Sequence, residues 1–249
     1  MKPNYLLIDY GNSYIKAAIY DSSYEKIIEY KNCPRTVNAR EILSRFLYLG
    51  DRHPTKVIES ITASADYAQP FNGQLKKLLN CDIRIVSRPD FEKILDLSNI
   101  PDDVFIGSDI MLCAYYASKQ FKESFVLSLG TAYFGIVLKN KQIINTFLFP
   151  SISKGMEHLA TLTTIPRDYI PEEYDMDKST NTRDAFATGA NWIIDGFIQK
   201  VVNEYKLKPE QVFLTGGDVY RFVKINKKYK ETKNMVLLAL AELLKEKDW

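Results

Sequence analysis

Cysteine and histidine are scarce in this sequence, which has three cysteines and two histidines among 249 residues. The cysteines, Cys33, Cys81 and Cys113, lie far apart and show none of the short spacings that are typical of metal sites. His53 and His158 have no partner at the spacing of metal ligands either. The pattern argues against a histidine–cysteine metal centre and predicts buried or free thiols in a reducing compartment.

A surplus of charge of one sign is also missing. The chain has 33 lysines and arginines against 31 aspartates and glutamates, a formal net charge of +2, and the two signs are scattered among each other. A surface dedicated to nucleic acid needs a concentrated basic face. We therefore expect no nucleic-acid partner.

Long apolar runs are absent as well. No segment approaches the roughly 20 apolar residues of a membrane span. The first apolar run is interrupted by Asp9 and Asn12, so it does not resemble a signal peptide. An apolar content of 46% and a charged content of 26% are ordinary for a globular protein, and the length suits one or two domains. We expect a cytoplasmic protein without a membrane partner.

One motif occurs twice. Residues 6–13 (LLIDYGNS) and residues 126–132 (VLSLGTA) each form an apolar strand that enters a glycine turn with small polar residues, and a second apolar strand follows each of them. The repeat predicts two related domains that face each other across a cleft. In that geometry each turn offers backbone N–H groups to a phosphate.

Periodicity predicts a mixed sheet with helices in both halves, and we place the boundary so that residues 1–118 and residues 119–249 form the two domains. The predicted strands are 5–9, 14–20, 26–31, 56–62, 82–86, 124–129, 133–138, 142–149 and 212–215. The predicted helices are 38–50, 71–79, 109–121, 153–163, 182–205 and 234–245, and the predicted loops are 100–109 and 164–182.

The first hairpin carries the strongest functional signal. Asp9 stands at the end of the strand, and Gly11, Asn12 and Ser13 form the turn. The carboxylate suits Mg²⁺, which takes oxygen ligands, while the amides and the hydroxyl suit phosphate oxygens. Lys16 on the next strand would reach the same phosphates. The alternative is an ordinary hairpin with turn residues at its turn.

The second hairpin differs where the first has its carboxylate, because Ser128 takes that position. Gly130 and Thr131 form its turn. A further strand enters Gly216 and Gly217, whose small size permits close backbone approach to an adenine or a ribose. A simple strand-to-helix turn is the alternative.

Asp109 is the candidate for proton transfer. It follows Gly107 and Ser108 at the start of a predicted helix, where an aspartate usually caps free backbone N–H groups. Beside a phosphate it would also accept the proton of a substrate hydroxyl, and the two roles are compatible. Thr182, ahead of the longest predicted helix, has the same two interpretations.

These residues together resemble the type III pantothenate kinase family over nearly the whole chain. The motifs that carry the resemblance are Asp9-x-Gly11-Asn12-Ser13 with Lys16, Gly107-Ser108-Asp109, Gly130-Thr131-Ala132, Thr182 with Gly189, and Thr215-Gly216-Gly217-Asp218. The resemblance implies an α/β fold of two ribonuclease-H-like domains, the actin-like ATPase fold, around a central cleft. It also implies a homodimer that phosphorylates pantothenate with ATP in the first step of coenzyme A biosynthesis.

The resemblance assigns roles to single residues. Residues 9–16 would bind the ATP phosphates and Mg²⁺, with Asp9 as the metal ligand. Asp109 would be the catalytic base, and Thr131, with the glycines of both later turns, would contact ATP. Gly107, Ser108, Asp109 and Thr182 would contact pantothenate.

Three positions depart from the family pattern. Ile110 stands where the family has an arginine that follows the catalytic aspartate, and Ser151 stands where it has a glycine. Ser128 stands where the family has an aspartate that helps to bind a monovalent cation such as potassium. The departures fall on the acceptor and cation sites and leave the ATP-side turn intact.

Two functions of different classes follow. The first is an active kinase, with pantothenate as acceptor or, given Ile110, another small hydroxylated acid. The second is a catalytically degenerate relative with a regulatory or binding role. We favour the kinase because Asp9, Asp109 and both glycine turns are present.

Overall fold

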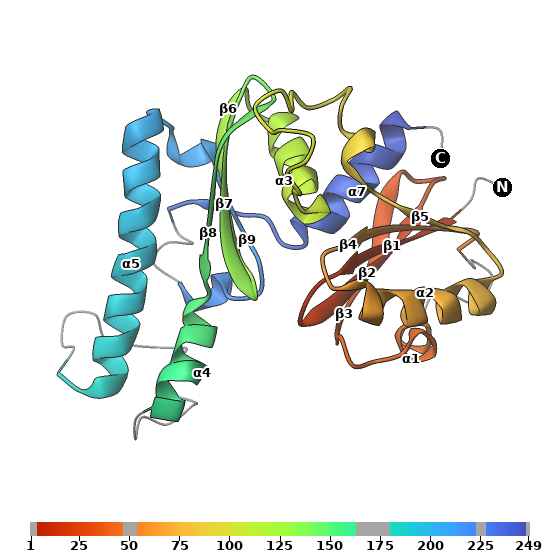
Figure 1. The fold of residues 1–249 in the computed structure, drawn as a ribbon, viewed down its shortest axis with the longest axis horizontal. Coiled ribbons are helices and arrows are strands. Elements are labelled where there is room, and N and C mark those ends of the chain that lie inside the picture. The colour runs from red at the N-terminus through yellow and green to blue at the C-terminus, as the bar shows by residue number, and fades with distance from the viewer. Residues whose placement is uncertain (1–3, 47–53, 163–179, 223–227, 248–249) are drawn as a thin grey trace. The chain divides into compact units, whose positions relative to one another are not determined.

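The computed structural model describes residues 4–46, 54–162, 180–222 and 228–247. The chain divides into two compact units (Figure 1). Unit 1 comprises Met1–Tyr116 together with Asn234–Trp249, and unit 2 comprises Ala117–Lys233. The second unit thus begins within two residues of the predicted boundary, but the end of the chain belongs to the first unit and not to the second.

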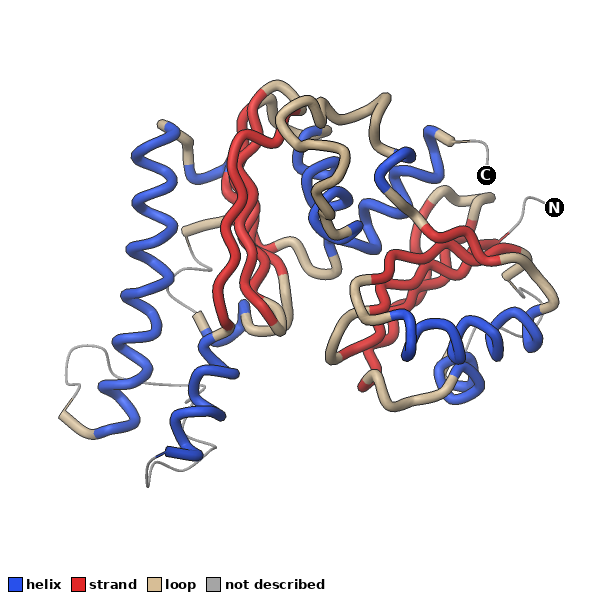
Figure 2. The backbone as a smooth tube through the Cα atoms, in the orientation of Figure 1, coloured by secondary structure: helices blue, strands red, loops and turns tan. Residues whose placement is uncertain are grey.

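Unit 1 is built on a five-stranded mixed sheet with the order β3-β2-β1-β4-β5. The strands are β1 (Asn4–Tyr10), β2 (Tyr14–Asp21), β3 (Lys26–Pro34), β4 (Lys56–Ile61) and β5 (Ile83–Ile85). The first three form an antiparallel meander, and β4 and β5 join parallel to β1. Figure 2 shows these strands in red. All five were predicted from the sequence.

Helices cover both faces of this sheet. On one face, α1 (Ala39–Ser44) and α2 (Ala65–Leu79) bury Leu6, Ile8 and Tyr10 of β1 in an apolar core. On the other, α7 (Met235–Glu246) packs against β1, as Figure 1 shows. The helix α3 (Ser108–Ser118) also belongs largely to unit 1, and a short 3-10 turn (Arg88–Asp90) follows β5.

Two helices of unit 1 differ from their predicted bounds. The helix α2 begins at Ala65, six residues before the predicted start, because Pro70 is accommodated inside it. A proline in the interior of a helix usually ends or kinks it, and α2 is an exception. The helix α1 begins after Asn38, which forms a capping box with Glu41, and it ends at Ser44. The rest of its predicted range lies partly outside the described residues.

Unit 2 repeats the topology of unit 1. Its sheet has the order β10-β9-β6-β7-β8. The strands are β6 (Glu123–Leu129), β7 (Ala132–Lys139), β8 (Gln142–Pro150), β9 (Val212–Thr215) and β10 (Lys230–Glu231). Here too a three-stranded antiparallel meander is extended by two parallel strands. The prediction of two α/β domains of related topology is confirmed.

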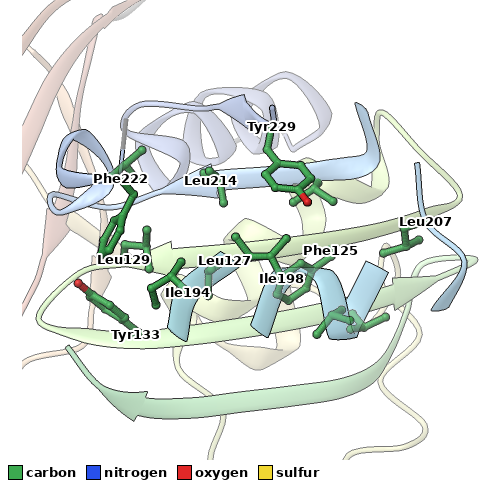
Figure 3. Close-up of a cluster of buried hydrophobic side chains, with 14 of the residues drawn as sticks. Phe125, Leu127, Leu129, Tyr133, Ile194, Ile198, Leu207, Leu214, Phe222 and Tyr229 are labelled. Carbon is green, nitrogen blue, oxygen red and sulfur yellow. The ribbon is translucent and has the colours of Figure 1, made fainter. Parts of the chain in front are cut away.

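The core of unit 2 lies between this sheet and the long helix α5 (Thr182–Tyr205). Ile194 and Ile198 of α5 pack on Phe125 and Leu127 of β6 (Figure 3). The helix α4 (Ile152–Leu162) follows β8, and two 3-10 turns, Pro209–Gln211 and Val219–Arg221, flank β9. Most of the loop predicted between α4 and α5 lies outside the described residues.

The described part of the chain contains no helix whose length and apolar character would let it cross a membrane. Cys33, Cys81 and Cys113 are all free thiols.

Candidate active site

The turn between β1 and β2 brings the first group of predicted residues together in unit 1. Asp9 is almost fully buried, and Lys16 lies opposite it on β2, with 3.3 Å between Lys16 Nζ and Asp9 Oδ2. The Gly11 amide donates to the Tyr14 carbonyl over 3.0 Å, and a Cβ at Gly11 would lie only 2.9 Å from that oxygen. The tight turn therefore requires glycine. It leaves Asn12 exposed and Ser13 partly exposed.

A pair of serines connects this turn to Asp109. Asp9 lies beside Ser60 in the parallel pairing of β1 with β4. The Ser60 hydroxyl is 2.8 Å from that of Ser108, and Ser108 also donates to the Ile61 carbonyl over 3.3 Å. These contacts fix the first residue of α3 on the end of β4. Asp109, the next residue, is thereby held in the neighbourhood of Asp9.

The hydroxyl of Ser108, a predicted substrate contact, is already used in contacts with β4. Its side chain is buried and its hydroxyl is engaged with β4. The sequence did not indicate Ser60 at all. The available signal was its place near the end of a predicted strand, beside the strand that carries Asp9.

Asp109 lies in the first turn of its own helix, and the charge of Asp9 in the first hairpin affects it. Its Oδ1 accepts the backbone N–H of Ile110 over 2.9 Å, in the first turn of α3. Burial, and after it the negative charge of Asp9, raise the pKa of the Asp109 carboxyl to about 6, against the opposing effects of the helix N–H groups and Lys16. Gly107 leaves room for this carboxylate, since a Cβ there would collide with Asp109 Oδ1.

Burial and the charge of Asp9 therefore account for the raised pKa of Asp109. The value is close enough to neutrality for the carboxyl to be ionised at pH 7 and still accept a proton.

In unit 2 the two later glycine turns lie side by side. Their strands, β6 and β9, are parallel neighbours, with Ser128 opposite Thr215. Gly216 has a φ of +101°, and a Cβ there would collide with the backbone of Leu129, the residue before Gly130. The Gly216–Gly217 turn is therefore pressed against the Gly130–Thr131 turn, and Thr131 is exposed.

Thr182 lies in unit 2 and is the first residue of α5, not its cap. The cap is Asn181, whose side chain accepts the Asp184 N–H over 2.9 Å. Thr182 is exposed and does not cap the helix. The capping role that we considered for Thr182 therefore belongs to Asn181.

The donor set for a metal is small. Among the described residues no three or more histidine, cysteine or acidic side chains cluster as metal ligands. Mg²⁺ needs no such cluster, because it is commonly held by one or two carboxylates, water and substrate phosphates. A buried carboxylate with small polar residues around it, as at Asp9, fits that mode of binding.

Solved structures have a similar fold at low sequence identity. A Campylobacter jejuni protein assigned to the Baf family of transcriptional activators has a TM-score of 0.61 at 17% identity, over 97% of this chain and 98% of that one. A Sinorhizobium meliloti protein assigned as a 2-dehydro-3-deoxygalactonokinase has a TM-score of 0.59 at 14% identity, over 97% and 98%. These likenesses show the fold, which is the two-domain actin-like α/β fold that the sequence predicted.

Comparison of the amino-acid sequence with known families identifies the family of the chain. The model of the type III pantothenate kinase family matches residues 5–204, most of the chain, and the chain belongs to that family. A type III pantothenate kinase of Mycoplasma mobile is 28% identical over 141 residues, which are 55% of this chain and 57% of that protein. One of Malacoplasma penetrans is 23% identical over 249 residues, 96% of this chain and 95% of that protein.

Membership of the family confirms the predicted enzyme class and function: the chain is a kinase that phosphorylates pantothenate, with ATP, in coenzyme A biosynthesis. The chain spans about half the length of the first of these relatives and nearly all of the second.

Proposed function

We propose that Asp109 is the catalytic base of this kinase and that it accepts the proton of the pantothenate hydroxyl as the γ-phosphoryl group of ATP is transferred. The observation that carries the proposal is the arrangement in unit 1. A carboxyl with a pKa of about 6 is held by the serine pair near Asp9 and Lys16. Phosphoryl transfer depends mainly on positioning and charge, and a carboxylate at this place supplies both.

The first hairpin would bind the phosphates. Asp9 would hold Mg²⁺, directly or through water, and the bound ion would neutralise charge on the phosphate oxygens. The amides of Asn12 and Ser13 would contact phosphate oxygens, while Gly11, whose own amide is bonded to the Tyr14 carbonyl, would shape the turn. Lys16 now pairs with Asp9 and would turn to the phosphates when the metal takes its place.

The nucleotide would also be held by Gly130, Thr131, Gly216 and Gly217 of unit 2. Pantothenate would be bound by the Gly107–Asp109 segment and by Thr182. Because the Ser108 hydroxyl is engaged with β4, the backbone of this segment is the part that it would offer.

One observation keeps a second function in view. Asp109 Oδ1 accepts a helix N–H, as a purely structural cap would, and Ile110 offers no charged donor to an acidic acceptor. A degenerate relative that binds nucleotide for a regulatory role, or a kinase with another acceptor, would look the same in these respects.

The test of function is ATP consumption by the purified chain with pantothenate, measured against a panel of small hydroxylated acids. We expect the highest kcat/KM with pantothenate and the appearance of 4'-phosphopantothenate. Turnover with a different acid only would indicate a changed acceptor. Absence of turnover with every acid, in a chain that binds ATP, would support the degenerate relative.

Replacing Asp9 with asparagine is expected to weaken the binding of Mg²⁺-ATP more than that of ATP without metal. The reason is that the amide lacks the charge that holds the cation. Calorimetric titration of both nucleotide forms would measure the difference. Equal weakening of the two forms would show that Asp9 supports the turn and does not bind metal.

The rate is expected to be nearly the same in potassium and in sodium buffers. Ser128 supplies no carboxylate at the position where the family binds its monovalent cation, and its side chain is nearly buried. Steady-state assays at equal ionic strength would measure the dependence. A large activation by potassium would mean that backbone carbonyls or a neighbouring carboxylate supply the ligands.

We also propose that the protein is a cytoplasmic homodimer. The free state of all three cysteines agrees with a reducing compartment. Trp192 and Ile193 of α5 are 68% and 63% exposed, which is high for large apolar side chains and suits an interface. Sedimentation velocity at micromolar concentration is expected to show a dimer, and a monomer would contradict the proposal.

A further inference from the structure

Two hydrogen-bonded contacts join the glycine turns of unit 2. The Asp218 amide donates to the Leu129 carbonyl over 2.8 Å, which ties the end of the Gly216–Gly217 turn to the residue before Gly130. The Asp218 carboxylate is held separately: its Oδ2 accepts the Tyr133 hydroxyl over 2.8 Å, and its Oδ1 faces Arg221 Nε at 3.3 Å. Asp218, directly after the turn, thus contacts Leu129 through its backbone and Tyr133 through its side chain.

Tyr133 is an unusual member of the core. It is fully buried on β7, with its ring edge-on to Phe149 and Phe222. Burial and the neighbouring Asp218 raise its pKa well above the usual range, so the phenol is a neutral donor. A phenylalanine would fill the same apolar space, and the hydroxyl therefore adds the link to Asp218.

From this arrangement we infer that Tyr133 and Asp218 are positioning residues for the nucleotide, because they fix the separation of the Gly130–Thr131 turn from the Gly216–Gly217 turn. The inference rests on the proposed role of these turns in ATP binding. If the two turns are free to move apart, their backbone groups must be ordered when the ligand binds. The free energy of that ordering lowers the affinity for the ligand.

The Tyr133 link reaches further than the turn. The same phenol oxygen interacts with the backbone amide of Ile152, the first residue of α4. Asp218 is thereby connected, through one buried side chain, to the strand after the first turn and to the helix after β8. Its carboxylate is partly buried and also pairs with Arg221.

The test compares two tyrosines of the same core. Tyr133→Phe removes the hydroxyl that binds Asp218. Tyr229→Phe is the matched control, because Tyr229 is buried in the same cluster and its hydroxyl has no hydrogen-bond partner among the described residues. Figure 3 shows Tyr133 beside Phe222 and Leu129, and Tyr229 nearer Leu214.

We expect Tyr133→Phe to raise the Kd and the KM for ATP about tenfold, the size of effect expected for a lost hydrogen bond to a charged group. The kcat at saturating ATP and the KM for pantothenate should change little, because the chemistry in unit 1 is untouched. Tyr229→Phe should bind ATP like the parent protein. An unchanged ATP affinity in Tyr133→Phe would overturn the inference.

A second readout does not depend on ATP. Hydrogen exchange at the Asp218 amide should become faster in Tyr133→Phe and not in Tyr229→Phe, because the amide reports the Leu129 contact directly. If the parent protein binds no ATP, the proposed function fails, and this measurement still decides whether the link holds the turns. Should Tyr133→Phe fail to fold, Asp218→Ala, which removes the acceptor of the Tyr133 hydroxyl and keeps the backbone amide, is expected to shift both readouts the same way. Normal readouts in that variant would overturn the inference.

Discussion

Replacing Asp109 with asparagine is expected to lower turnover about 10²-fold or more and to leave ATP binding nearly unchanged. The carboxylate is the group proposed to orient the acceptor hydroxyl and to take its proton, and an amide is a much weaker base. ATP, in contrast, is proposed to bind through the first hairpin and the glycine turns. Steady-state kinetics with pantothenate and an equilibrium titration of ATP would measure the two effects.

This substitution separates the two roles of Asp109. The amide oxygen of asparagine can still accept the Ile110 N–H, so this hydrogen bond in the first turn of α3 is preserved while the basic carboxylate is lost. The melting temperature should therefore change little. Asp66→Asn, at an exposed aspartate in the first turn of α2, is the matched control and should leave turnover unaffected.

A different outcome would contradict the proposal that Asp109 is the catalytic base. If the parent protein turns over no acceptor and Asp109→Asn changes only the melting temperature, Asp109 is a helix cap. The chain would then be a degenerate member of its family.

Replacing Glu59 with glutamine is expected to stabilise the protein by about 3 kcal/mol at pH 7 and by little at pH 5. Glu59 on β4 is fully buried, and burial raises its pKa from 4.5 to about 8, with the Asn72 side chain lowering it slightly. Asn72 Nδ2 donates to Glu59 Oε2 over 2.6 Å. Glu59 Oε1 and Asn72 Oδ1 have no partner among the described residues.

The sign follows from proton binding. The folded state keeps the Glu59 proton up to about pH 8, whereas the unfolded state releases it near pH 4.5. Between these values the folded state binds the extra proton, so stability falls as the pH rises. Glutamine carries no proton to lose. Its amide also supplies the donor that Asn72 Oδ1 lacks, as a protonated Glu59 would.

Denaturant unfolding at several pH values would test this prediction, with Glu210→Gln at an exposed glutamate as the control. The curve of stability against pH should be flatter in Glu59→Gln than in the parent protein and unchanged in the control. A loss of stability in Glu59→Gln at pH 7 would show that the buried carboxylate is ionised and compensated.

The sequence predicted the features that are local. The strand, glycine turn and strand of each hairpin are encoded within about a dozen neighbouring residues, so Gly11 and Gly130 were placed correctly at turns. The start of α2 was predicted six residues too late, and the helix contains Pro70 although helices usually exclude proline from their interior.

Features that depend on contacts distant in the sequence were not predicted. The Ser60–Ser108 pair, the Tyr133–Asp218 link and the buried Glu59 each join elements that no periodicity relates. For the same reason the apolar pattern of α7 identified a helix but not the sheet that it covers.

The return of α7 to unit 1 has a consequence for the order in which the protein is made. A ribosome completes unit 2 at residue 233, and the helix that covers β1 in unit 1 emerges only afterwards. Leu237 and Leu240, which are fully buried on α7, leave an apolar face of the first sheet uncovered until then. Unit 1, which carries Asp9 and Asp109, is therefore finished after unit 2 during synthesis, and termination before residue 235 would yield a chain whose second unit is whole and whose first unit is not.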